Sequence, residues 1–294
     1  MTDPCLIRQK STPLPLLPPP ELPPDLEVLC SPELPPLKGI HSVIFDVYGT
    51  LFISAAGDIG SGDNEPHYSL DSLAREYGLS AEQLRGYFQK AVLKRHGELR
   101  GRSPYPELRV EELWAEFLEQ HGHGNTMDKA RELALRYELT VNPVYPMPDA
   151  EKTLGILRER LIPLGLISNA QFFTPLLFEA FFNAPPKNLG FDPELLIYSF
   201  ELGEAKPSPN LFSPAVRRLK SLGLEPENAL YVGNDMLNDI SPAAQAGFKT
   251  VLFAGDRRSL RLREGESRVK GVRPDRIIRN LKDLPALFVP HGLY

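Results

Sequence analysis

The sequence has little cysteine and no long apolar run. Its 294 residues include two cysteines, Cys5 and Cys30, both near the N-terminus. A disulfide framework is therefore excluded for the rest of the chain, and a reducing compartment fits. No apolar run reaches the roughly 20 residues that a membrane-spanning helix needs, and prolines and acids interrupt the N-terminal leucines, unlike the core of a signal peptide. We therefore expect a cytoplasmic protein with no membrane partner.

An excess of positive charge is also lacking. The formal net charge is -5, so the chain has no general attraction to nucleic acid or to anionic lipid. The one basic segment, residues 257–276, also contains three acids and indicates a solvated loop. Hydrophobic residues make up 42% and charged residues 24%, which is typical of a soluble globular enzyme.

Proline is abundant, and many of the 30 prolines fall in residues 1–37. Proline fixes φ and lacks an N–H donor, so this segment is expected to be a disordered, extended tail. The stretches "PLLP" and "PELP" have the spacing of polyproline-II ligands, which leaves open a weak contact with a partner through residues 13–36.

From residue 38 onward, short apolar runs alternate with helical patterns. The runs end in "SVIF", "LGLIS", "LLIYSF", "NALYVG", "KTVLFAG" and "DRIIRN". Continuous apolar runs rich in β-branched residues are typical of strands buried on both faces. The alternation predicts an α/β fold, a doubly wound parallel sheet formed by residues 38–55 and 142–294.

Residues 56–141 have a different pattern, with apolar residues at helical spacing and no strand signal. Ser80 followed by Gln83 predicts a capping box at the start of one helix. A Gly-rich connection at one end and a Pro-rich connection at the other suit paired hinges. This segment is predicted to be an inserted helical cap domain.

Polar residues follow several of the predicted strands. In open α/β sheets, ligands bind beyond the carboxyl ends of the strands. Singly, each residue could close a turn, cap a helix or face solvent, but their common placement points to a site. These residues are Asp46, Thr50, Ser168, Asn169, Lys206, Asp235 and Asp239.

The stretches "DVYGTLF", "ISN", "AKPSP" and "GNDMLND" resemble the four motifs of the haloacid dehalogenase superfamily, whose members have a Rossmann-like core with an inserted cap. The resemblance implies that Asp46 is a nucleophile that forms an aspartyl-phosphate or an aspartyl ester. It implies that Lys206 neutralises developing charge and that Thr50, Ser168 and Asn169 bind phosphate. It also implies Mg²⁺, held by Asp46, the Tyr48 backbone carbonyl and Asp235, with Asn234 and Asp239 as accessory or alternative ligands.

Tyr48 stands where phosphatases resembling this family usually carry a second aspartate, the general acid. Three readings are open. In the first, the protein is a 2-haloacid dehalogenase, because a halide leaves without a proton and dehalogenases share this tyrosine. In the second, it is a Mg²⁺-dependent phosphatase with a weaker or different acid. In the third, it binds a phospho-ligand or a partner without catalysis. The acids after Gly233 favour the second, so we predict a hydrolase that acts on a small phosphorylated metabolite.

Overall fold

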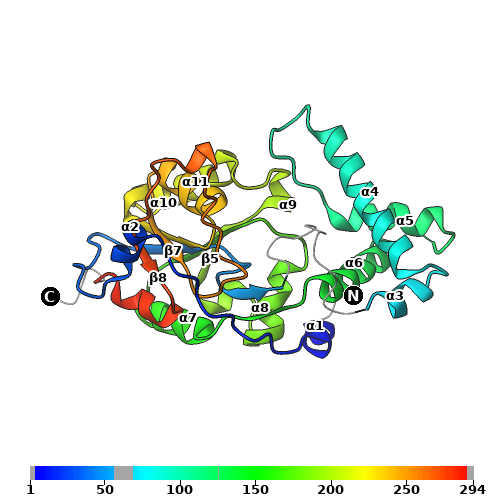
Figure 1. The fold of residues 1–294 in the computed structure, drawn as a ribbon, viewed down its shortest axis with the longest axis horizontal. Coiled ribbons are helices and arrows are strands. Elements are labelled where there is room, and N and C mark those ends of the chain that lie inside the picture. The colour runs from blue at the N-terminus through cyan, green and yellow to red at the C-terminus, as the bar shows by residue number, and fades with distance from the viewer. Residues whose placement is uncertain (1–3, 56–68, 125, 290–294) are drawn as a thin grey trace.

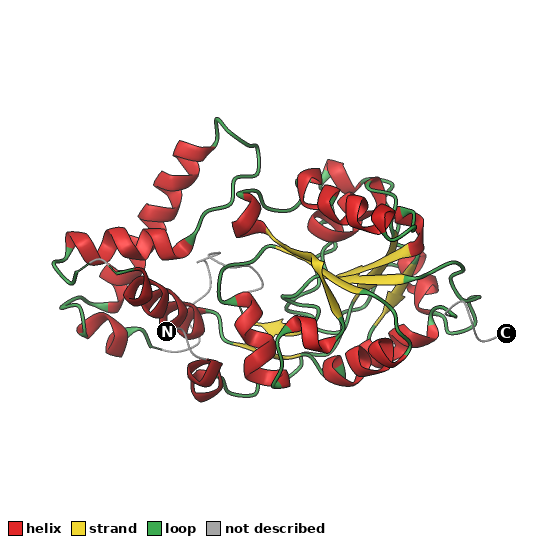
Figure 2. Ribbon diagram, turned by 180° about the vertical axis from the view of Figure 1, so that it is seen from behind, coloured by secondary structure: helices red, strands yellow, loops and turns green. Residues whose placement is uncertain are grey.

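The core of the protein is a six-stranded sheet with the order β5-β4-β1-β6-β7-β8, in which every pairing is parallel. The computed structural model describes residues 4–55, 69–124 and 126–289. All six predicted strands are present, and the predicted α/β class is confirmed (Figure 2). The strands are β1 (Ser42–Phe45), β4 (Leu164–Ser168), β5 (Phe191–Tyr198), β6 (Ala229–Gly233), β7 (Lys249–Phe253) and β8 (Arg276–Ile278).

Helices cover both faces of this sheet (Figure 1). On one face, α10 (Ser213–Ser221) and α11 (Ser241–Gln245) enclose a cluster of apolar side chains that includes Ile44 of β1. On the other, α7 (Ala150–Glu159) and α8 (Thr174–Phe182) pack against a cluster that includes Phe45. Neighbouring strand residues point to opposite faces, so a fully apolar strand buries both sides.

Helices of the inserted segment form a separate group beside the sheet (Figure 1). They are α3 (Asp71–Arg75), α4 (Ala81–Leu99), α5 (Val110–Gln120) and α6 (Met127–Val141). The predicted capping box at the start of α4 is confirmed by reciprocal hydrogen bonds between Ser80 and Gln83. Aromatic side chains pack between these helices, where Trp114 stacks on Phe88 with ring centroids 5.3 Å apart. Both rings belong to the same cluster of buried apolar side chains as Phe45 of β1.

A small antiparallel sheet lies where the cap joins the core. It pairs β2 (Phe52–Ser54) with β3 (Val144–Pro146) and was not predicted from the sequence. Ser54 Oγ donates to the side-chain oxygen of Asn142 at 2.9 Å, which ties the two connections together. Most of the predicted Gly-rich hinge, residues 56–66, lies outside the described residues.

The N-terminal segment differs from the expected disordered tail, because its described part packs along the core. It contains α1 (Pro4–Lys10), α2 (Pro24–Glu27) and the 3₁₀ turn η1 (Val28–Cys30). Ile7 is fully buried, and α1 packs against α8. Arg279 forms a two-pronged ion pair with Glu27. Proline spacing alone could not reveal these contacts, since they depend on apolar and charged partners about 170–250 residues further along the chain.

We predict that replacing Ile7 with alanine lowers the free energy of unfolding by about 2–5 kcal/mol, because it removes a fully buried side chain. Urea denaturation measures this. The matched control is Leu16→Ala in the same segment, where the leucine is 40% exposed and the expected change is within about 0.5 kcal/mol. Equal effects of the two substitutions would show that the segment does not pack as described.

Candidate active site

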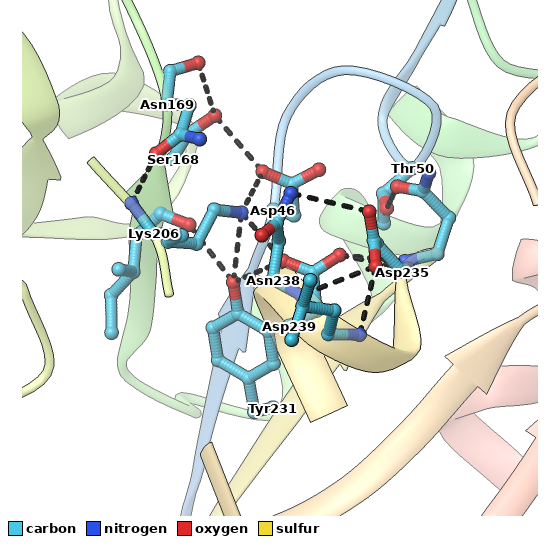
Figure 3. A network of polar contacts seen from close by, with 12 residues as sticks. Asp46, Thr50, Ser168, Asn169, Lys206, Tyr231, Asp235, Asn238 and Asp239 are labelled. Carbon is cyan, nitrogen blue, oxygen red and sulfur yellow. Dashed lines mark hydrogen bonds and ion pairs between the residues drawn. The ribbon is translucent and has the colours of Figure 1, made fainter. Parts of the chain in front are cut away.

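Asp46 lies directly after β1, where the strand ends in a tight turn (Figure 3). Only 5% of the residue is exposed. Its Oδ1 accepts hydrogen bonds from Ser168 Oγ at 3.0 Å and from Lys206 Nζ at 2.6 Å. Ser168 is the last residue of the neighbouring strand β4. Parallel strands deliver their carboxyl ends to one edge, which brings these residues together as the sequence predicted.

Lys206 lies between two carboxylates. Its ammonium contacts Asp46 Oδ1 at 2.6 Å and Asp239 Oδ1 at 2.5 Å, and its side chain is only 3% exposed. Burial acts to lower the pKa of Lys206, but the charges of Asp239 and Asp46 outweigh it and raise this pKa above its ordinary value. The lysine therefore stays charged, whereas burial raises the pKa of Asp239 to about 7 against the opposing charge of Lys206.

Asp239 also organises the loop after β6. Its Oδ2 accepts the backbone N–H groups of Asn234 and Asp235, each at 3.0 Å. The loop approaches Asp239 so closely that a Cβ on Gly233 would lie 2.5 Å from the Asp239 Cβ, which only glycine avoids. The next turn, η5 (Met236–Ile240), is a turn of π-helix, a feature frequent at functional sites. Asp239 thus joins Lys206 to the loop that carries Asn234 and Asp235.

Asn234 and Asp235 point to different partners. Asn234 Oδ1 accepts from Thr50 Oγ1 at 3.0 Å, and its amide nitrogen donates to the Ser259 carbonyl at 2.7 Å. Both oxygens of Asp235 accept from the Arg263 guanidinium, at 3.1 Å from its Nε. The side chain next to Thr50 is therefore the neutral amide, whereas the carboxylate of Asp235 is neutralised by an arginine.

Two predicted residues have supporting contacts. Asn169 Oδ1 accepts the backbone N–H of Lys206 at 2.6 Å and so fixes the loop that carries the lysine. The Tyr48 hydroxyl is 2.9 Å from Thr174 Oγ1, inside the protein. Burial raises the pKa of Tyr48, and the charges of Glu138 and Asp46 act in the same direction. Its phenol therefore remains protonated at physiological pH.

The donor set bears on whether Mg²⁺ fits. Within the described ranges, no three or more His, Cys, Asp or Glu side chains form a group that could hold a metal. However, Mg²⁺ is often held by one or two carboxylates together with substrate phosphate and water. Asp46 Oδ2, the Tyr48 carbonyl and the Asn234 amide oxygen are compatible with such a site. The ion pair with Arg263 gives no support to Asp235 as a ligand, and the choice of ligand stays a prediction.

Two residues of the site were missed by the sequence analysis. The Tyr231 hydroxyl lies 3.1 Å from Asp239 Oδ1, 3.4 Å from Lys206 Nζ and 2.9 Å from the Ile167 carbonyl oxygen. Tyr231 belongs to the apolar run of β6, and the sequence pattern there predicts a core residue. Arg263 lies in the basic segment predicted to be a solvated loop. No local signal could have revealed either role.

Comparison with known proteins agrees with this geometry. The family model of haloacid dehalogenase-like hydrolases matches residues 40–247. The glyceraldehyde 3-phosphate phosphatase of Methanopyrus kandleri is 34% identical over 112 residues, which are 36% of this chain and 42% of that protein. The phosphoglycolate phosphatase of Escherichia coli is 32% identical over 168 residues, 55% of this chain and 60% of that protein. The chain thus spans about half the length of the curated relatives it matches.

A solved structure extends the similarity in fold. The crystal structure of 2-haloacid dehalogenase from Pseudomonas syringae pv. Tomato DC3000 matches with a TM-score of 0.50 and 24% identity. The match covers 84% of this chain and 97% of that one. At this identity the likeness shows the fold alone. The family match covers well over half of the sequence and includes the loops that surround Asp46 and Lys206. The chain belongs to the haloacid dehalogenase-like hydrolases.

Proposed function

We propose that this hydrolase removes the phosphoryl group from a small phosphorylated metabolite through an aspartyl-phosphate on Asp46. The observation that carries the proposal is the unequal use of the two oxygens of Asp46. Oδ1 is held by Ser168 and Lys206, whereas Oδ2 accepts no hydrogen bond from any residue that the structure describes. A carboxylate fixed at one oxygen and free at the other is positioned to act as a nucleophile.

The reaction would proceed in two displacements at phosphorus. In the first, Asp46 Oδ2 forms a bond to phosphorus, the bond to the leaving oxygen breaks, and that oxygen leaves with the electron pair. In the second, water attacks the same phosphorus, the Asp46–phosphorus bond breaks, and phosphate is released with Asp46 restored as a carboxylate. Lys206 would counter the negative charge that accumulates in both transition states.

Mg²⁺ is part of this proposal. When bound, it would neutralise phosphate charge and so allow an anionic carboxylate to approach. The residues proposed to hold it are Asp46, Tyr48 through its backbone carbonyl, and Asn234 through its amide oxygen. The position of Asn234 beside Thr50 and the ion pair of Asp235 with Arg263 support this choice.

Tyr48 limits the range of leaving groups. Its phenol is hydrogen-bonded to Thr174, and burial raises the pKa of Tyr48. The phenol is therefore a poor proton donor to a departing alkoxide. A leaving group that is stable as an anion needs no such donor. The proposal therefore favours acyl phosphates and other activated phosphates over simple alkyl phosphate esters.

Dehalogenation remains a second candidate, and two features favour it. Tyr48 replaces the usual acid, and Asn234, a neutral residue, directly follows Gly233. A halide leaves without a proton, and attack of Asp46 on carbon would form an ester that water then hydrolyses. The phosphatase names of the sequence relatives support the first candidate over this one.

We expect phosphate release from one or more acyl or activated phosphates and no halide release from 2-haloacids. A substrate panel assayed with and without Mg²⁺ measures both products. Replacing Asp46 with asparagine should lower turnover by a factor of about 10⁴ or more, because it removes the nucleophile. Halide release without Mg²⁺, with no phosphate release in its presence, would overturn the proposal.

The metal ligands can be distinguished by a pair of substitutions. Asn234→Asp adds a carboxylate beside Thr50 and should lower the Mg²⁺ concentration needed for half-maximal activity. Asp235→Asn keeps the size of a side chain that is paired with Arg263 and should leave this concentration nearly unchanged. Titration of activity with Mg²⁺ after treatment with a chelator gives both values. If this Mg²⁺ concentration rises strongly in Asp235→Asn and not in Asn234→Asp, Asp235 is the ligand.

Replacing Tyr48 with phenylalanine should leave turnover within a few-fold of the parent. The substitution removes only the hydrogen bond to Thr174, whose loss should cost about 1 kcal/mol of stability. Steady-state kinetics and urea denaturation test the two statements. If the Tyr48 hydroxyl is the general acid instead, the rate should fall by about 10²–10⁴ for substrates with poor leaving groups.

A further inference from the structure

The segment between α4 and α5, residues 103–109, is one of the places where the cap contacts the core. Its backbone pairs with the loop that leads to Lys206. The N–H of Ala205 donates to the Tyr105 carbonyl at 2.9 Å, and the N–H of Glu107 donates to the Gly203 carbonyl at 3.0 Å. Between these bonds, Pro106 and Glu204 form an antiparallel bridge. This part of the cap is therefore joined to a loop of the active site.

The Glu107 side chain extends the contact to a second active-site loop. Its Oε2 accepts from Ser199 Oγ at 2.6 Å, and its Oε1 lies 3.3 Å from Gln171 Nε2. Ser199 Oγ in turn accepts the N–H of Ala170 at 2.8 Å. Ala170 and Gln171 follow Ser168 and Asn169 directly. One cap carboxyl thus contacts the loop after β4 and the turn after β5 together.

Gln171 strengthens this link. Its Oε1 accepts the N–H of Val110, the first residue of α5, at 3.1 Å, and its Nε2 donates to the Leu108 carbonyl at 2.9 Å. Its own N–H donates to Thr174 Oγ1, the partner of the Tyr48 hydroxyl. A continuous set of hydrogen bonds therefore runs from the cap to the turn that holds Asp46.

We propose that Glu107 is a positioning residue that couples cap docking to the assembly of the active site. When residues 103–109 are docked, its carboxyl holds the loops that carry Ser168 and Lys206 around Asp46. Protonation of Glu107 favours the docked arrangement, so docking weakens as the pH rises. The effect on turnover rests on the proposed function, whereas the effect on docking does not.

The electrostatic surroundings of Glu107 explain why its protonation favours the docked arrangement. Burial raises the pKa of Glu107 to about 7, and the hydrogen bonds from Ser199, Leu108 and Gln171 oppose this only in part. The described part of the chain shows no ion pair that involves Glu107. Its own segment carries Arg109 and meets Arg268, which donates to the Tyr105 hydroxyl and pairs with Glu266. The adjoining elements carry Glu111, Glu201, Glu204 and Lys206, and Arg131 lies 4.0 Å from Glu111.

These neighbouring cations have other partners. The Arg109 guanidinium lies 6.0 Å from the centre of the Phe200 ring and donates to the Phe200 carbonyl. Lys206 is shared by two aspartates. Arg131 lies over the Phe172 ring at 5.4 Å. None of them compensates an ionised Glu107, so the neutral carboxyl suits the docked state better. When Glu107 is protonated, its proton lies on Oε2 and is donated to Ser199 Oγ, whose own hydroxyl can then donate to the Ala170 carbonyl at 3.2 Å.

The direction of the pH effect on docking follows from the difference in the pKa of Glu107 between the undocked and docked states. An undocked, solvated glutamate has a pKa of about 4.3, whereas the docked Glu107 has a raised pKa of about 7. The docked state is thus fully favoured below about pH 4.3, and its equilibrium constant falls about tenfold per pH unit between these values. Above about pH 7 both states are ionised and the constant no longer changes.

Hydrogen exchange of the full-length protein between pH 5 and pH 8 tests docking without a substrate. The amides to follow are those of Glu107 and Ala205, whose protection, corrected for intrinsic exchange rates, should fall more than tenfold between pH 5 and pH 7. Glu107→Gln mimics the protonated side chain and should keep protection constant with pH. The matched control is Glu111→Gln, which changes a buried cap carboxyl whose pKa is raised by burial and which lies 4.0 Å from Arg131. This control should behave as the parent does.

A measurement of activity distinguishes failure of the proposed phosphatase function from failure of the proposed docking role of Glu107. With an active substrate, Glu107→Gln should flatten the decline of kcat/KM between about pH 5 and pH 7, and Glu111→Gln should not. Identical exchange profiles in the parent and Glu107→Gln would overturn the coupling. If exchange follows the prediction while no phosphorylated substrate is turned over at any pH, the proposed function fails and the docking inference stands.

Discussion

The site depends on the buried ammonium of Lys206, which lies between Asp46 and Asp239. Removing one member of a buried ion pair typically costs about 3–5 kcal/mol, because the remaining charge loses its partner. The arrangement links three strand ends, since Asp46 follows β1, Lys206 follows β5 and α9 (Ser199–Leu202), and Asp239 follows β6. The loops of the site are thus held by one cation, which also fixes the orientation of Asp46.

The surrounding contacts connect this cluster to the rest of the molecule. Asn169 holds the backbone of Lys206, and Asp239 holds the backbone of Asn234 and Asp235. On the cap side, the Glu107 carboxyl contacts Gln171 and Ser199, and its backbone N–H donates to the Gly203 carbonyl. Hydrogen bonds therefore connect residues 103–109 of the cap with the loops beside Asp46 and Lys206.

Two departures from the usual family pattern act together on the chemistry. Tyr48 provides no ready proton, and Asn234 provides a neutral oxygen in place of an acid. In the proposed reaction, the first would favour leaving groups that are stable as anions, and the second would reduce the negative charge available to a cation.

The sequence alone determined the six core strands, the cap helices and most of the polar residues at the strand ends, because strand and helix patterns are local and parallel strands share one edge. Only the tertiary structure decided the docking of residues 4–37, the β2–β3 pairing and the partners of Asp235 and Glu107. These depend on residues far apart in the chain, such as Arg263 and Ser199, whose closeness is fixed only when the loops pack. Residue types and spacing therefore predicted which polar residues gather at the strand ends, while long-range packing decided the partners of their carboxylates.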